Sequence, residues 1–206
     1  MTPPSRSASA ASAPPSSTSW CRSPTHRETA SSLALRGYKD EYLYATRYHH
    51  AMRLAAILWR FLIAHEDHVA HASGVETFNV GGVVPSKTTQ NDEARPGLRT
   101  IVGTVVEHTA ARFERLLRPT DAELVGRYFD PGRYATSREL AGASVLLIDD
   151  TWVSGSSAQS AAAALRRAGA AHVACVVIGR WLTPSFGGEW APFATATRNC
   201  RSASTG

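Results

Sequence analysis

The fold of this 206-residue chain is decided by one stretch: Val145-Leu146-Leu147-Ile148-Asp149-Asp150-Thr151-Trp152-Val153-Ser154-Gly155-Ser156-Ser157. Its first four residues form a continuous apolar run, which is typical of a strand buried on both faces of a parallel sheet. A run with high helix propensity follows from Ala158 to Arg167, and Gly169 stands where helices commonly end. The stretch therefore predicts a buried strand, an acidic pair, a Ser/Gly loop and a helix, in that order.

The Ser/Gly loop suits a bound anion, because a loop entering a helix offers unpaired backbone N–H groups and the positive end of the helix dipole. Ser154, Ser156 and Ser157 can add hydroxyl donors, and Gly155 lets the backbone approach the anion closely. The pair Asp149-Asp150 can bind vicinal sugar hydroxyls or hold Mg²⁺ through its waters. Together these features predict a sugar-phosphate ligand. The alternative is an ordinary strand-to-helix turn in which one of the two aspartates only caps the helix.

The same stretch resembles the motif that binds 5-phosphoribosyl-1-pyrophosphate (PRPP) in type I phosphoribosyltransferases. In that family four apolar residues precede two acids and a Thr/Ser-Gly-x-Thr/Ser loop. The resemblance implies an α/β fold with an open, mostly parallel, Rossmann-like sheet flanked by helices. It also implies an enzyme that transfers a phosphoribosyl group to an unidentified base or amine and releases pyrophosphate. The stretch has neither the Gly-Lys-Ser/Thr of a nucleotide P-loop nor the glycines of a dinucleotide-binding fingerprint.

The resemblance assigns roles to two segments. Asp149 and Asp150 would be the catalytic acids, contacting the ribose hydroxyls or holding the cofactor Mg²⁺ through water. The 5-phosphate of PRPP would be bound by Thr151, Val153, Ser154, Gly155, Ser156 and Ser157. Its pyrophosphate would be bound by Pro85, Ser86 and Lys87, in the loop after the first core strand. Val153 stands where the family commonly has Thr or Ser, and an exposed loop lysine is the alternative reading of Lys87.

The same resemblance implies roles for two further regions. The mobile hood loop of the family would lie near residues 130–138, which makes Arg133 and Arg138 candidate anion contacts. Residues 179–182 follow the last strand, where family members often place groups that recognise the acceptor.

Within the family, the chain resembles most the competence-associated bacterial members, which are named by homology to amidophosphoribosyltransferases. Classical members of that group carry an N-terminal zinc-binding cysteine cluster, whereas Cys21, Cys175 and Cys200 are scattered. Two alternatives to an enzyme therefore stand: a non-catalytic PRPP-binding regulator, and a competence or DNA-uptake accessory protein on the same fold.

Composition narrows the class of protein further. The apolar fraction of 43% supports a real core. The net charge of +5 comes entirely from arginines in residues 1–27 and 190–206, and residues 28–189 hold 17 basic and 17 acidic side chains. Because no basic stripe is evident, a nucleic-acid partner is not expected. No apolar run approaches the roughly 20 residues of a membrane span. With few cysteines, these features favour a cytoplasmic protein. The resemblance implies an enzyme of nucleotide metabolism, which is compatible with a homodimer.

The boundaries and elements follow from composition and periodicity. Residues 1–32 are rich in Ser, Ala and Pro and predict a disordered tail, followed by a phosphoribosyltransferase-like domain at 33–190 and a C-terminal tail at 191–206. Within the domain we expect a strand or turn at 33–40, a helix at 41–71, the first core strand at 74–84, a polar loop at 85–97, a helix at 98–117, a strand at 124–129, a turn at 130–133 and a buried strand at 172–178.

Three histidines, His65, His68 and His71, fall at the end of the first long predicted helix. Positions three apart can share a helix face, but a spacing of six drifts away from it. The run His65-Glu66-Asp67-His68 is one residue short of the His-Glu-x-x-His zinc motif. A solvated helix end is therefore favoured over a metal site.

Overall fold

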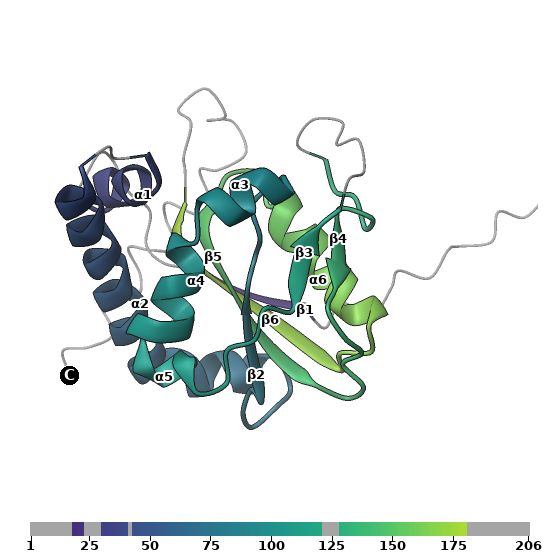
Figure 1. Cartoon of the computed structure of the whole chain (residues 1–206). Helices are drawn as coiled ribbons and strands as arrows, with labels where there is room; N and C mark the ends of the chain where they lie inside the picture. The colour runs from purple at the N-terminus through teal and green to yellow at the C-terminus, as the bar shows by residue number, and fades with distance from the viewer. Residues whose placement is uncertain (1–17, 23–29, 41–42, 121–127, 181–206) are drawn as a thin grey trace, which may run out of the picture.

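The computed structural model describes residues 18–22, 30–40, 43–120 and 128–180, with only the backbone given for 18–22, 30–32 and 40 (Figure 1). Four strands form one sheet in the order β1-β6-β5-β2, and every neighbouring pair is parallel. Their bounds are Thr18–Arg22 for β1, Val80–Val83 for β2, Ser144–Trp152 for β5 and His172–Arg180 for β6. The mixed α/β fold with a parallel sheet confirms the predicted fold class at this level.

Helices and one small hairpin cover the sheet. The helices are α1 (Ala30–Asp40), α2 (Tyr44–Ala72), α3 (Thr89–Ala94), α4 (Gly97–Thr100), the π-helical turn η1 (Ile101–Val105), α5 (Glu107–Ala110) and α6 (Ser156–Arg167). The hairpin pairs β3 (Leu117–Pro119) with β4 (Tyr134–Thr136) in antiparallel fashion. In Figure 1, α1, α2, α4 and α5 lie on one side of the sheet, and α6 and the hairpin lie on the other.

The central strand β5 separates two apolar cores. Leu146 and Ile148 belong to the core under α1 and α2, and Val145 and Leu147 belong to the core under α6 and the hairpin. All four side chains are fully buried. Alternate residues of a strand point to opposite faces, so a continuous apolar run is what a strand between two helical layers requires.

Both ends of α6 lie where the sequence places them. Gly155 precedes the helix with φ 79°, and Gly169 follows it with φ 97°, a left-handed conformation that favours glycine at both positions. Ala158, Ala161 and Leu165 are buried against the sheet. The alanine-rich face lets the helix lie close over β5 and thereby fixes the loop that precedes it.

Several predicted elements differ from the structure. Residues 33–40 form most of helix α1 rather than a strand or turn, and α1 buries Ala34 and Tyr38, one turn apart, against the core. The first core strand, predicted at 74–84, is shorter in the structure and spans only β2 (Val80–Val83). Strand β1, which pairs with β6, and the start of α1 at Ala30 lie within residues 1–32, where a tail was expected. Of the predicted strand at 124–129, residues 124–127 lie outside the described residues, and so do the tail at 191–206 and residues 181–182.

The helix predicted at 98–117 is broken into short pieces. It stops at Val106, whose backbone is extended (φ −86°, ψ 93°). The chain then turns back beside β2, where the Gly81 N–H donates to the Arg112 carbonyl and the Glu114 N–H donates to the Gly81 carbonyl (both 2.8 Å). A side chain at Gly82 would press on Leu116, at 3.2 Å. The glycine pair thus allows this segment to cover the sheet edge.

The described helices include none with the length and apolar character needed to cross a bilayer.

Candidate functional site

A cavity of about 730 Å³ opens at the C-terminal edge of β2 and β5. Because β2 and β5 are neighbouring parallel strands, with Val83 in register with Ile148, the segments that follow them emerge side by side. The cavity is lined by every residue of the two predicted segments: Pro85, Ser86, Lys87, Asp149, Asp150, Thr151, Val153, Ser154, Gly155, Ser156 and Ser157. This edge is where open α/β sheets usually bind ligands.

The acidic pair lies inside β5 rather than after it, because the strand continues to Trp152. Asp149 is 9% exposed and Asp150 is 7% exposed. The Asp150 N–H donates to Asp149 Oδ1 (2.9 Å). Burial and, next, the charge of Asp150 raise the pKa of Asp149 to about 8, against the opposing effects of Lys39 and backbone N–H groups. Two carboxyl groups with such different surroundings are typical of functional sites.

Helix α1 holds Asp150 from across the cavity. Lys39 Nζ lies 2.5 Å from Asp150 Oδ2, and the Tyr38 hydroxyl donates to the same oxygen. Burial raises the pKa of Tyr38, and the charge of Asp150 adds to this effect, so the phenol remains a donor. These contacts were not predicted from the sequence, because residues 33–40 were not expected to be helical. The spacing of Ala34 and Tyr38 was the available signal.

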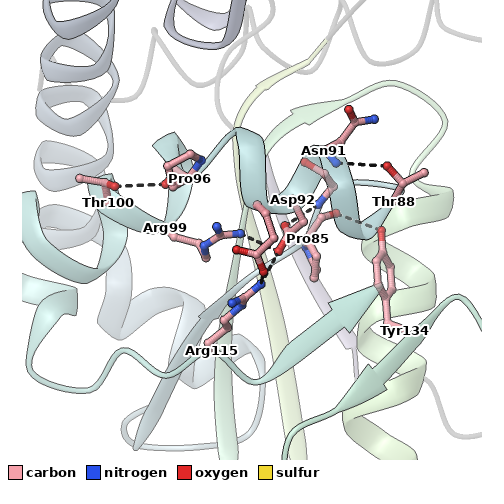
Figure 2. Close-up of polar contacts among 11 residues, drawn as sticks. Pro85, Thr88, Asn91, Asp92, Pro96, Arg99, Thr100, Arg115 and Tyr134 are labelled. Carbon is pink, nitrogen blue, oxygen red and sulfur yellow. Dashed lines mark hydrogen bonds and ion pairs between the residues drawn. The ribbon is translucent and has the colours of Figure 1, made fainter. Parts of the chain in front are cut away.

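Asp92 of α3 holds the predicted pyrophosphate segment in place. Its carboxylate is 4% exposed and accepts the Ser86 N–H at Oδ1 (3.0 Å). Arg99 Nη1 (2.6 Å) and Arg115 Nη2 (2.9 Å) both donate to Oδ2. Figure 2 shows Asp92 between the two arginines. The sequence missed Asp92 because residues 85–97 were predicted to be a loop, whereas Thr88 caps a helix there by accepting the Asn91 N–H (3.2 Å).

Tyr134 of the hairpin connects the two segments beneath the cavity. Its hydroxyl donates to the Pro85 carbonyl (3.2 Å), as Figure 2 shows, and it also lies beside the Ser157 hydroxyl. Burial raises the pKa of Tyr134 to about 12. The phenol is therefore a neutral donor that joins the end of β2 to the loop before α6.

Basic side chains outnumber acids around the cavity. Lys87 is exposed at its rim and forms no ion pair with any residue that the structure describes. The other basic lining residues are Arg36, Lys39, Arg95 and Arg99, against Asp92, Asp149 and Asp150. A multiply charged anion matches this excess of positive charge.

Other residues singled out from the sequence are not brought to the cavity. Arg138 forms two hydrogen bonds to the Glu114 carboxylate (2.8 and 2.9 Å), and neither Arg133 nor Arg138 lines the cavity. His65, His68 and His71 are exposed on α2. The described part of the chain contains no group of three His, Cys, Asp or Glu side chains suited to holding a metal ion.

The acidic pair fits Mg²⁺ only as part of its coordination shell. Asp149 and Asp150 offer carboxylate oxygens, which Mg²⁺ prefers, but Asp150 already accepts from Tyr38 and Lys39. Asp92 is engaged by two arginines. Mg²⁺ at such a site would need further ligands, such as waters or a bound phosphate group.

Trp152 packs over the loop that begins α6. A Cβ atom at Gly155 would lie 2.2 Å from Trp152 Cζ2. Since the indole also contacts the core under α6, it supports the loop from one side. Val153, where the family pattern has a hydroxyl residue, is exposed at the cavity wall.

Gly155→Ala is expected to destabilise the protein more than Gly142→Ala does. Both glycines have positive φ (79° and 72°), but a Cβ at Gly142 has no neighbour within 4 Å. The control therefore measures the backbone cost, about 1–2 kcal/mol. The clash with Trp152 should add roughly 1–3 kcal/mol. Urea unfolding of the two variants measures the difference, and equal losses would contradict the packing of Trp152 on the loop.

Comparison with protein-family models, with curated proteins and with solved structures gave no match for this chain. The functional argument therefore depends on the cavity and its residues.

Proposed function

We propose that the cavity binds PRPP together with Mg²⁺, and that the protein transfers the phosphoribosyl group to a base or amine with release of pyrophosphate. One observation carries the proposal: the segments 85–87 and 149–157, far apart in sequence, line a single cavity at the edge of two parallel strands. An acidic pair, a helix N-terminus and an excess of basic side chains together match a sugar that carries phosphate at both ends.

Each part of the cavity has a role in this reaction. The loop before α6 binds the 5-phosphate through its N–H and hydroxyl groups, and Asp149 and Asp150 bind the ribose hydroxyls. Pro85, Ser86 and Lys87 bind the pyrophosphate. The bond from C1 to the pyrophosphate oxygen breaks, that oxygen keeps the electron pair, and the acceptor nitrogen forms the new bond to C1. Mg²⁺ would be held by Asp149 and Asp150, and when bound it would supply positive charge to neutralise the leaving group. Fixed donors stabilise the developing charge better than water does.

A PRPP-binding regulator without turnover is the second candidate. Lys39 and Tyr38 already satisfy Asp150, and the predicted hood residues Arg133 and Arg138 lie away from the cavity. Both features favour ligand binding over a closed catalytic complex.

Calorimetric titration with PRPP in the presence of Mg²⁺ tests the proposal. The unmodified protein should show saturable binding, and the double variant Asp149→Asn, Asp150→Asn should weaken it at least about tenfold, since it removes both carboxyl groups that face the ribose and the metal. Asp67→Asn, an exposed acid on α2, is the control and should bind like the unmodified protein. Absence of binding by the unmodified protein would exclude both candidates.

Pyrophosphate release, measured with PRPP and a panel of purine, pyrimidine and simple amine acceptors, then separates the two candidates. Release that depends on one acceptor supports the transferase. Tight binding of PRPP with no release across the panel supports the regulator.

A further inference from the structure

Arg133 is a buried cation without a matching anion among the described residues. It is 1% exposed, and its Nη2 donates to the Tyr128 carbonyl (2.9 Å). Among the residues that the structure describes, its Nε and Nη1 atoms have no hydrogen-bond partner, and it forms no salt bridge with a carboxylate. A buried guanidinium without a carboxylate costs considerable free energy, so its presence needs a reason.

The surroundings of Arg133 place this charge behind the loop that begins α6. Arg133 and the Ser157 hydroxyl both lie next to the phenol of Tyr134 and lower its pKa against the effect of burial. The turn of the hairpin rests on α6, because the Asp130 N–H donates to Ser160 Oγ (3.0 Å). These contacts place Arg133 beside the first turns of α6, whose N-terminus is the positive end of the helix dipole, so its charge adds to that positive potential.

The loop itself has no charged side chain after the acidic pair, since residues 151–157 are all neutral. The basic side chains that line the cavity come from α1 and from the segment between Lys87 and Arg99. The loop itself therefore has no side-chain charge to balance an anion bound there; the basic residues that line the cavity come from other segments, and Arg133 lies behind the loop.

We propose that Arg133 is a positioning residue that supplies a buried positive charge to a phosphate group bound at the loop Val153–Ser157. Because Arg133 does not line the cavity, it acts through Tyr134 and Ser157 and does not touch the ligand. In a dry interior a charge acts over a longer distance than in water. The ligand-free protein bears the cost of the unpaired cation, and the bound phosphate compensates it. The inference rests on the proposed function for the identity of the anion.

Two neutral variants and one charged variant test the inference, with inorganic phosphate and PRPP as probes. Arg133→Met removes the charge, Arg133→Gln removes it but keeps a donor for the Tyr128 carbonyl, and Arg133→Lys keeps the charge. Arg138→Met is the matched control, because it removes a charge from the same part of the chain at a position that is 46% exposed. The readouts are the Kd from calorimetry and the melting temperature with and without phosphate.

The neutral variants should weaken phosphate and PRPP binding about tenfold or more, and their ligand-free melting temperature should be unchanged or higher. Arg133→Lys should retain most of the affinity, and Arg138→Met should retain all of it. If a neutral variant folds and binds phosphate like the unmodified protein, the inference is wrong, and so it is if Arg138→Met weakens binding equally. If the unmodified protein binds neither probe, the proposed function itself fails. Binding of PRPP by Arg133→Gln with unchanged Kd overturns only the inference.

Discussion

Asp149→Asn is expected to stabilise the folded protein, and to do so more at alkaline than at acidic pH, although Asp149 belongs to the proposed binding site. The carboxyl group is buried beside Asp150, and its pKa is raised from 3.8 to about 8. Asparagine has nearly the same shape and never ionises, so it removes the cost of burying a charge.

The direction of the pH dependence follows from linkage. A carboxyl group with a raised pKa binds its proton more tightly in the folded state than in the unfolded chain. This tighter proton binding contributes to the free energy of unfolding. The contribution is fully present below about pH 4 and is lost progressively as the pH rises toward 8. The advantage of Asp149→Asn over the unmodified protein should therefore grow by about 2–4 kcal/mol between pH 5 and pH 8.5.

Urea unfolding at the two pH values measures this effect. Asp67→Asn is the matched control, because Asp67 is exposed on α2 and its replacement removes the same charge from water. The control should show the same difference between the two pH values as the unmodified protein. A constant advantage of Asp149→Asn at both pH values would mean that the carboxyl group ionises freely in the folded state.

A residue whose replacement stabilises the fold is retained for another reason, and ligand binding is the usual one. The same reasoning applies to Arg133, which is buried without a carboxylate on the far side of the loop. One buried acid and one buried base thus flank the loop of residues 153–157 at a cost to stability. Sugar hydroxyls or a metal ion bound at Asp149, and a phosphate bound near Arg133, would offset this loss of folding stability.

The sequence was sufficient to predict those parts of the fold that depend on residues close together in the chain. The run Val145–Ile148 was predicted to be a strand buried on both faces, and Gly169 was predicted to follow the end of α6. The two lining segments were predicted from the resemblance to the phosphoribosyltransferase motif, and in the structure they follow neighbouring parallel strands at one edge of the sheet.

Contacts made by distant residues could not be predicted. Tyr38 meets Asp150 across more than one hundred residues of chain, and no local pattern of residues reveals that contact. The helix predicted at 98–117 has the correct periodicity, yet it breaks at Val106 because the chain returns to pair with Gly81 at the sheet edge. In both cases tertiary packing overrides the local preference.

Asp92→Asn is expected to lower the free energy of unfolding by about 2–4 kcal/mol and to weaken pyrophosphate binding. Asp92 is buried and accepts from the Ser86 N–H, from Arg99 and from Arg115 (Figure 2). Asparagine places an amide where one carboxylate oxygen stood, so the arginines lose the anion between them. Breaking a buried ion pair by removing one partner typically costs about 3–5 kcal/mol. The loss here should be smaller, because Arg115 is partly exposed and keeps its contact with Glu93.

Glu93→Gln is the matched control, since Glu93 neighbours Asp92 on α3 and pairs with the same Arg115 (2.5 Å) but is exposed. Its unfolding midpoint should stay close to that of the unmodified protein. Because Asp92 fixes the Ser86 backbone, Asp92→Asn should also weaken binding of pyrophosphate, while inorganic phosphate at the loop before α6 should bind as before. Loss of affinity for both anions would mean that Asp92 supports the whole cavity, whereas the selective loss is the result expected if the segment 85–87 holds the pyrophosphate.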